Sequence, residues 1–289
     1  MAESAIRALL AGLIDYAGLF PPAALSMGEA VANYAAYRGS PDAWVLGRFV
    51  VPVARLVEFE TLAASRPSGA PWPLSVLAHG DDCRAIIAFN ARHEGRAVIE
   101  TVEARAATPA AVTALAPLAA VAAVFVEIPV HDDPDALVAT IGAHGLRAKI
   151  RTGGVTADAF PSARDVARFL SACARHDVMF KATAGLHHPL RGDFALTYAA
   201  DAPRGAMFGF LNVFLAAAFM RRGLPVAEAA LLLDERDAGA ISFSADVAAW
   251  RGHSLSVGAL AEARARFALS FGSCSFREPI DDLSALPLQ

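Results

Sequence analysis

The chain has 289 residues, a hydrophobic content of 55% and a mean hydropathy of +0.41, so it can bury a large core and is not generally disordered. Its formal charge of −4, with arginines scattered singly, argues against a nucleic-acid or anionic-membrane partner and favours a small-molecule ligand. Three widely spaced cysteines suggest neither a disulfide framework nor a zinc ribbon. The most apolar run, 210–220, is too short to span a bilayer, so we expect a soluble, cytoplasmic protein.

Short runs rich in Val, Ile, Leu and Phe alternate along the chain with Ala-rich stretches that have helical spacing. The predicted strands lie, in chain order, at 13–20, 44–52, 74–79, 97–103, 123–130, 146–152 and 178–185, and the last at either 240–244 or 268–275. Strands buried on both faces and alternating with helices indicate parallel βα units. Thr108 and Ser162 are predicted N-caps of two of the helices.

Eight such units in one chain of this length predict a single (β/α)8 TIM-like barrel over residues 1–289, with an open doubly wound sheet as the alternative. Residues 190–260 do not resolve into simple βα units. We expect them to form a helical insertion near the barrel mouth, after the seventh strand. The segment 15–24, DYAGLFPPAA, suits a rigid loop over the mouth because of its two consecutive prolines.

Catalytic groups in such barrels sit at the carboxyl ends of the strands. The only lysines in the chain, Lys149 and Lys181, fall at two of these expected ends. Arginine is always charged, whereas a desolvated lysine beside another cation loses its proton more readily and can form a Schiff base with a carbonyl compound. The alternative is that the lysines are fixed charges, which hold an anionic ligand or pair with Glu127 inside the barrel.

The two lysine motifs resemble those of a known enzyme family. Residues 149–154, KIRTGG, are similar to the K-T-S-T-G-F strand end of the deoxyribose-phosphate aldolase family, and residues 181–186, KATAGL, resemble its K-A-S-G-G-[IV] on the next strand. The resemblance covers this region of the chain only. It implies a barrel of the class I aldolase type, in which Lys149 forms the Schiff base and Lys181 lowers the pKa of Lys149.

Other site residues follow from the same region. No aspartate matches the family's proton relay, and Glu127, one strand before Lys149, is expected to take that role. Arg151 stands where the family has a small hydroxyl residue, and we expect it to bind a substrate carboxylate. Glycines after the lysines should let backbone N–H groups approach an anionic substrate end. The expected substrate-binding residues are therefore Arg151, Gly153, Gly154, Gly185, His187, His188 and Asp15.

The pair His187-His188 also raises a metal hypothesis. Adjacent residues of an extended segment point in opposite directions, so one ion would take one of them. The other ligands would come from strand ends, namely His79, Glu100, Glu103 and Glu127. No H-x-H or H-E-x-x-H spacing supports such a site, so no cofactor is expected and a divalent metal is the alternative.

Three functions remain open. The first is a class I lyase or aldolase that acts on a small anionic carbonyl compound through a lysine Schiff base. The second is a metal-assisted lyase, isomerase or hydrolase, and the third is a non-catalytic barrel that binds a metabolite. Cys274 is expected to be a buried inert thiol, and Asn212 either a polar core residue or a substrate contact. A homo-oligomer is compatible with the sequence.

Overall fold

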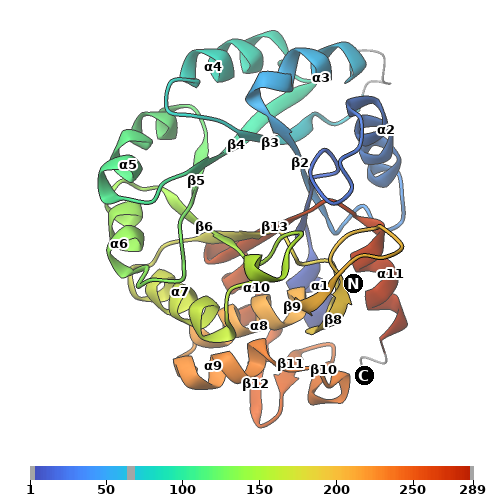
Figure 1. The fold of residues 1–289 in the computed structure, drawn as a ribbon, viewed down its shortest axis with the longest axis vertical. Helices are drawn as coiled ribbons and strands as arrows, with labels where there is room; N and C mark the ends of the chain where they lie inside the picture. Colours follow the sequence, from blue (N-terminus) through green and yellow to red (C-terminus); the bar gives the residue numbers. More distant parts are fainter. Residues whose placement is uncertain (1–3, 64–68, 287–289) are drawn as a thin grey trace.

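The computed structural model describes residues 4–63 and 69–286, and within them eight parallel strands close into a barrel (Figure 1). The predicted (β/α)8 barrel is therefore confirmed, and the doubly wound sheet is wrong. Around the barrel the strands follow the order β1 (Ile14–Tyr16), β13 (Ala268–Ser273), β7 (Phe180–Thr183), β6 (Arg147–Arg151), β5 (Ala123–Glu127), β4 (Ala97–Arg105), β3 (Trp72–Leu77) and β2 (Leu46–Pro52).

Of the two candidates for the last strand, 268–275 is right and 240–244 is wrong. β13 closes the barrel between β1 and β7 through parallel pairing on both sides. Residues Ile241–Phe243 form β10, which pairs antiparallel with β11 (Val247–Trp250) in a separate sheet that β12 (His253–Ser256) completes. The chain turns back directly after β10, and a parallel neighbour would need a longer crossover.

Helices surround the barrel, and the two predicted N-caps are present. The Thr108 hydroxyl accepts a hydrogen bond from the Ala111 N–H, and Ser162 forms a capping box with Asp165. Each cap satisfies N–H groups that the first helical turn leaves unpaired. The helices are α1 (Ala5–Leu10), α2 (Met27–Arg38), α3 (Leu56–Ala63), α4 (Cys83–Arg92), α5 (Pro109–Ala114), α6 (Asp135–Ala143), α7 (Ala163–Arg175), α8 (Phe210–Met220), α9 (Val226–Leu233), α10 (Val257–Arg266) and α11 (Arg277–Ala285).

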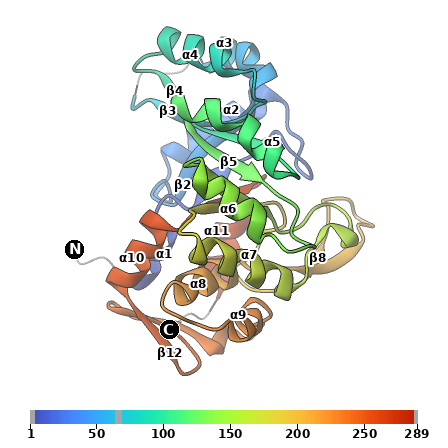
Figure 2. The same cartoon turned by 90° about the vertical axis from the view of Figure 1, so that its left-hand side faces the viewer.

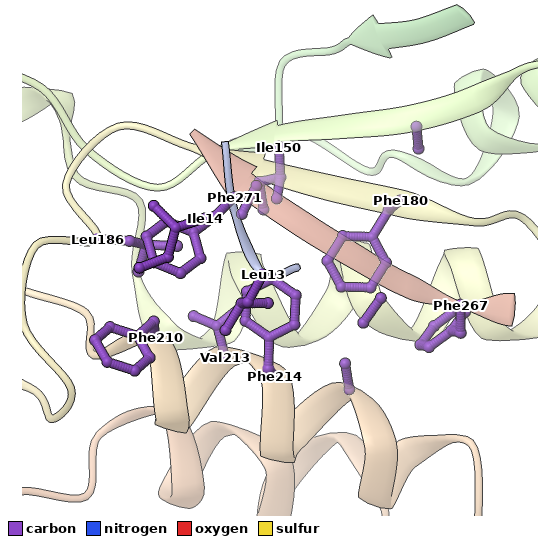
Figure 3. Close-up of a cluster of buried hydrophobic side chains, with 14 of the residues drawn as sticks. Leu13, Ile14, Ile150, Phe180, Leu186, Phe210, Val213, Phe214, Phe267 and Phe271 are labelled. Atoms are coloured by element: carbon purple, nitrogen blue, oxygen red, sulfur yellow. The ribbon is translucent and has the colours of Figure 1, made fainter. Parts of the chain in front are cut away.

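The core between the barrel wall and α8 is aromatic (Figure 3). Every residue of α8 is buried, which explains why the run 210–220 is so apolar without being a membrane span. The Phe210 ring stacks on Phe271 of β13 at 5.5 Å, and the Phe214 ring stacks on Phe180 of β7 at 6.4 Å. These contacts hold α8 against β13 and against β7, the strand that carries Lys181.

The region 190–260 is not confirmed as a helical insertion. It contains α8 and α9 but also the hairpin of β8 (Gly192–Ala195) and β9 (Arg204–Met207), and the three-stranded sheet β10–β12. In Figure 2 the hairpin lies at one end of the barrel and α1 at the opposite end. Residues of the hairpin and of its connecting loop line the cavity at the barrel mouth, so part of the region does lie where we expected.

Candidate active site

A cavity of about 420 Å³ opens at the carboxyl ends of the barrel strands, where the fold predicts the active site. The loop after β1 contributes Phe20, Pro21 and Pro22, which confirms that this proline-rich segment lies at the mouth. Strand ends, the β8–β9 loop and α11 supply the polar lining: Glu103, Arg105, Lys149, Arg151, Thr183, His187, His188, Tyr198, Cys274 and Glu278.

Lys149 lines this cavity and is held between two carboxylates. Its Nζ lies 2.7 Å from Oε2 of Glu103 and 2.8 Å from Oε2 of Glu127. Its side chain is 5% exposed. Lys149 therefore forms the ion pair with Glu127 that the alternative interpretation of the lysines predicts, and its amine is surrounded by negative charge.

Lys181 lies directly beside Lys149 in the register of β6 and β7, as expected. It does not line the cavity; its Nζ donates hydrogen bonds of 2.6 Å to Oδ2 of Asp15 and Oε1 of Glu103. Burial lowers the pKa of Lys181, but the two carboxylates outweigh burial and leave that pKa raised. The two ammonium groups thus share the Glu103 carboxylate, one on each oxygen, so the positive charge of Lys181 is already offset.

Glu103 is the centre of the buried network. Its side chain bridges both lysines and accepts a further hydrogen bond of 2.6 Å from the Ser75 hydroxyl. Burial alone would raise its pKa, yet Lys149 and Lys181 hold the pKa of Glu103 well below its usual range. A carboxylate so committed is a strong electrostatic anchor and a weak proton acceptor.

Asp15 belongs to this network and not to the cavity wall, which corrects its expected role in substrate binding. Its side chain is fully buried and accepts hydrogen bonds from Lys181, the Ser270 hydroxyl and the Arg48 N–H. Its Oδ1 would lie 2.4 Å from a Cβ at Gly47, so only glycine leaves room for the carboxylate there. Asp15 therefore positions Lys181 from the β1 side of the barrel.

Glu127 joins Lys149 to two guanidinium groups. Its Oε1 lies 3.0 Å from Nε of Arg151 and 3.2 Å from Nε of Arg105. Its buried Oε2 pairs with Nζ of Lys149 at 2.8 Å. Burial would raise the pKa of Glu127, but the opposite effects of Lys149, Arg151 and Arg105 together are larger and leave that pKa below its usual range. Glu127 thus lies within proton-transfer distance of the Lys149 amine.

His187 and His188 each pair with a carboxylate of α11. Nδ1 of His187 lies 3.0 Å from Oε2 of Glu278, and Tyr198 donates a hydrogen bond of 3.1 Å to the same oxygen. His188 contacts Asp282 and stacks on a phenyl ring of β8. Both histidines line the cavity, and their role in substrate binding stays a prediction. The Glu278 contact fixes the orientation of the His187 ring and leaves Nε2 for a ligand.

The loops after β6 and β7 are tied together. The Thr152 hydroxyl donates to the Ala184 carbonyl at 2.6 Å, and Ala184 adopts a left-handed conformation with φ of 62° beside Gly185 with φ of 72°. A left-handed alanine costs about 1–2 kcal/mol, and such strain often accompanies functional loops. Gly154 and Gly185 line the cavity, but Gly153 does not; it packs under the Phe160 ring, where a Cβ would lie 2.4 Å from a ring carbon.

Several candidates lie elsewhere. His79 is exposed beyond β3, and Glu100 pairs with Arg48 outside the cavity, so neither meets the histidines. In the described part of the chain no three His, Cys, Asp or Glu side chains are grouped as a metal site. Asn212 is a core residue that bonds backbone groups. Cys274 does line the cavity, but burial raises the pKa of its thiol, as expected of an inert cysteine.

Sequence reasoning missed Arg105, Tyr198 and Glu278, and considered Glu103 only as a metal ligand. The alternation of side-chain direction along a strand was the one signal in the sequence that could have found a further cavity residue. Glu103 and Arg105 lie two residues apart on one strand and both face the cavity. Tyr198 and Glu278 come from a hairpin loop and a terminal helix, and no spacing in the sequence links them to the lysines.

No family model, curated protein or solved structure matches this chain. The function is therefore inferred from the fold and from the geometry of the cavity. Within the described residues, no helix has the length and apolarity that a membrane crossing requires.

The buried network predicts how stability depends on pH. The pKa of Glu127 is lower in the folded than in the unfolded protein, so its contribution is complete above the unfolded value of about 4.3 and declines as pH falls below it. The raised pKa of Lys181 acts in the opposite sense: its contribution is complete below about 10.4 and is lost above that value. We expect the free energy of unfolding in urea to fall at both extremes.

Glu127→Gln is the matched test of the acid side, because it removes the titrating group and keeps the shape. The difference in unfolding free energy between wild type and Glu127→Gln should shrink as pH falls from 6 to 3. A difference that stays constant across this range would show that Glu127 does not titrate with a lowered pKa.

Proposed function

We propose that this protein is a class I lyase of the aldolase type, which acts on a small anionic carbonyl compound through a Schiff base at Lys149. One observation supports this most strongly: of the two lysines, Lys149 reaches the cavity and Lys181 is sealed beneath it. An amine nucleophile must touch its substrate, whereas a lysine that only orders carboxylates need not. Lys181 acts as a positioning residue, because it holds Glu103 against Lys149.

The resting ammonium ion must lose a proton before it attacks a carbonyl. Glu127 is the better acceptor, because Glu103 is shared by two lysines and the Ser75 hydroxyl, whereas Lys149 is the only lysine that pairs with Glu127 among the described residues. The neutral Lys149 amine then adds to the carbonyl carbon and water leaves, which gives an iminium ion. This scheme keeps Glu127 in the proton-transfer role expected of it.

The later proton transfers need a general base that faces the same cavity. His187 is the candidate, because its ring lines the cavity and Glu278 fixes its orientation. In a cleavage reaction, His187 takes the proton of the hydroxyl group two carbons from the iminium carbon. The bond between the hydroxyl-bearing carbon and the carbon next to the iminium carbon breaks, which releases the first, carbonyl product. The electron pair of this bond converts the iminium ion to a neutral enamine. Protonation and hydrolysis then release the second product and the amine.

Hydrogen exchange tests this proposal without knowledge of the full substrate. An iminium ion at Lys149 acidifies the adjacent carbon, so the wild-type protein should catalyse the replacement of methyl hydrogens of pyruvate by deuterium in D2O, followed by proton NMR. His187→Asn keeps a donor for Glu278 but removes the imidazole ring, and we expect exchange to slow by about 10²-fold or more. His176→Asn, which changes a histidine that pairs with Asp135 and does not line the cavity, is the control and should change exchange little. Wild-type protein without exchange activity would contradict the proposal.

A further inference from the structure

The cavity contains a pair of guanidinium groups on the two strands that flank β5. Arg105 comes from β4 and Arg151 from β6, and each places Nε on the same oxygen of Glu127. Within the described part of the chain neither has another ion-pair partner. The side chains are 71% and 40% exposed, so their remaining N–H groups face solvent at the cavity.

The charges of the connected network do not cancel. Asp15, Glu100, Glu103 and Glu127 supply four negative charges, and the cations that contact them are Lys149, Lys181, Arg48, Arg105 and Arg151. The inner members are fully paired, so the single surplus positive charge lies at the exposed arginines. A monoanion neutralises this surplus charge, whereas a phosphate dianion would leave a net negative charge. The planar guanidinium groups, with their parallel N–H donors, also match the planar geometry of a carboxylate.

The position of Lys149 limits how far this anion lies from the reacting carbonyl. The Lys149 ammonium and the Arg151 guanidinium bind the two oxygens of one carboxylate group, so they are immediate neighbours. A ligand whose carboxylate rests on Arg105 and Arg151 is therefore held close to Nζ of Lys149. The same cavity is also lined by the apolar side chains of Val50, Leu77 and Phe20.

We propose that Arg105 and Arg151 form the carboxylate subsite for a 2-oxo acid, whose carbonyl carbon Lys149 attacks. This inference rests on the proposed function and specifies its substrate class. The bonds that break and form then define the reaction. A hydroxyl at C4 loses its proton to His187, the C3–C4 bond breaks to release an aldehyde, and the electron pair moves to the iminium at C2. Protonation of C3 and hydrolysis give a shorter 2-oxo acid.

Selective trapping tests the subsite in the full chain. Pyruvate and acetone share a methyl ketone, but only pyruvate carries the carboxylate. With borohydride present, pyruvate should modify the Lys149 peptide at a concentration about tenfold or more below that needed for acetone, the factor expected for charge-assisted hydrogen bonds. Arg105→Gln and Arg151→Gln should each remove most of this preference, measured as the ratio of the two effective concentrations within each variant. Arg222→Gln, which removes the same charge from an exposed pair with Glu262, is the control.

Binding of oxamate provides an independent measurement, because oxamate resembles pyruvate but cannot form the iminium ion. Calorimetry should show oxamate binding to wild type and to Arg222→Gln, weakened about tenfold in Arg105→Gln and Arg151→Gln. Equal trapping of pyruvate and acetone, unaffected by either arginine, would overturn the subsite and leave the Schiff base intact. If no carbonyl is trapped, the proposed function fails, and oxamate binding alone decides the subsite: arginine-dependent binding supports it, and absent or arginine-independent binding overturns it.

Discussion

Replacement of Lys149 by arginine should abolish Schiff-base chemistry while the barrel stays folded. Arginine keeps the positive charge, so it can still pair with Glu103 and Glu127 and spare the network an unpaired buried carboxylate. It cannot form an iminium ion, because the guanidinium stays protonated. We expect deuterium exchange into pyruvate to fall by about 10⁴-fold or more, as when a covalent nucleophile is lost.

Circular dichroism and urea unfolding of Lys149→Arg provide the control for folding. Arginine is preferable to methionine here, because methionine would leave Glu103 and Glu127 without their shared cation and mix loss of chemistry with loss of stability. A folded Lys149→Arg protein with wild-type exchange activity would show that Lys149 is not the nucleophile.

Replacement of Lys181 by methionine should cost about 3–5 kcal/mol of stability, the usual effect of removing one partner from a buried ion pair. Lys181 is fully buried, and its ammonium is shared by Asp15 and Glu103. Without it, two buried carboxylates lose a cation and must either remain charged or take up protons. Urea unfolding at neutral pH measures this cost.

The double variant Lys181→Met with Asp15→Asn separates electrostatics from packing. If uncompensated negative charge causes the loss, neutralising Asp15 should recover part of the unfolding free energy that Lys181→Met removes. If the double variant is less stable than Lys181→Met by the full cost of Asp15→Asn alone, the two residues act independently, and our description of the network is wrong.

Much of the fold could be read from the sequence. The six inner runs of β-branched and aromatic residues all became barrel strands, since strands buried on both faces are uniformly apolar. The last strand could not be chosen, because 240–244 and 268–275 are both short runs in which apolar residues alternate with serine and other small residues. The chain that follows each run distinguishes them. A tight turn into β11 follows 240–244, whereas α11 returns to the barrel mouth after 268–275.

The site could be read in part. The two lysines were identified because each ends a predicted strand, and consecutive parallel strands place them side by side. The sequence could not show that Glu103 would separate their charges, because which oxygen a lysine reaches depends on side-chain direction inside the closed barrel. Asp15 was misplaced for a similar reason: at its level in the barrel, an inward side chain lies beneath the cavity and not in it.

Reductive trapping followed by peptide mapping shows which lysine forms the Schiff base. The chain has only two lysines, so borohydride reduction in the presence of pyruvate gives a simple result by mass spectrometry. We expect the added mass on the peptide that contains Lys149 and none on the peptide that contains Lys181. Modification of Lys181, or of neither lysine at saturating pyruvate with or without acetone as an alternative carbonyl, would contradict this expectation.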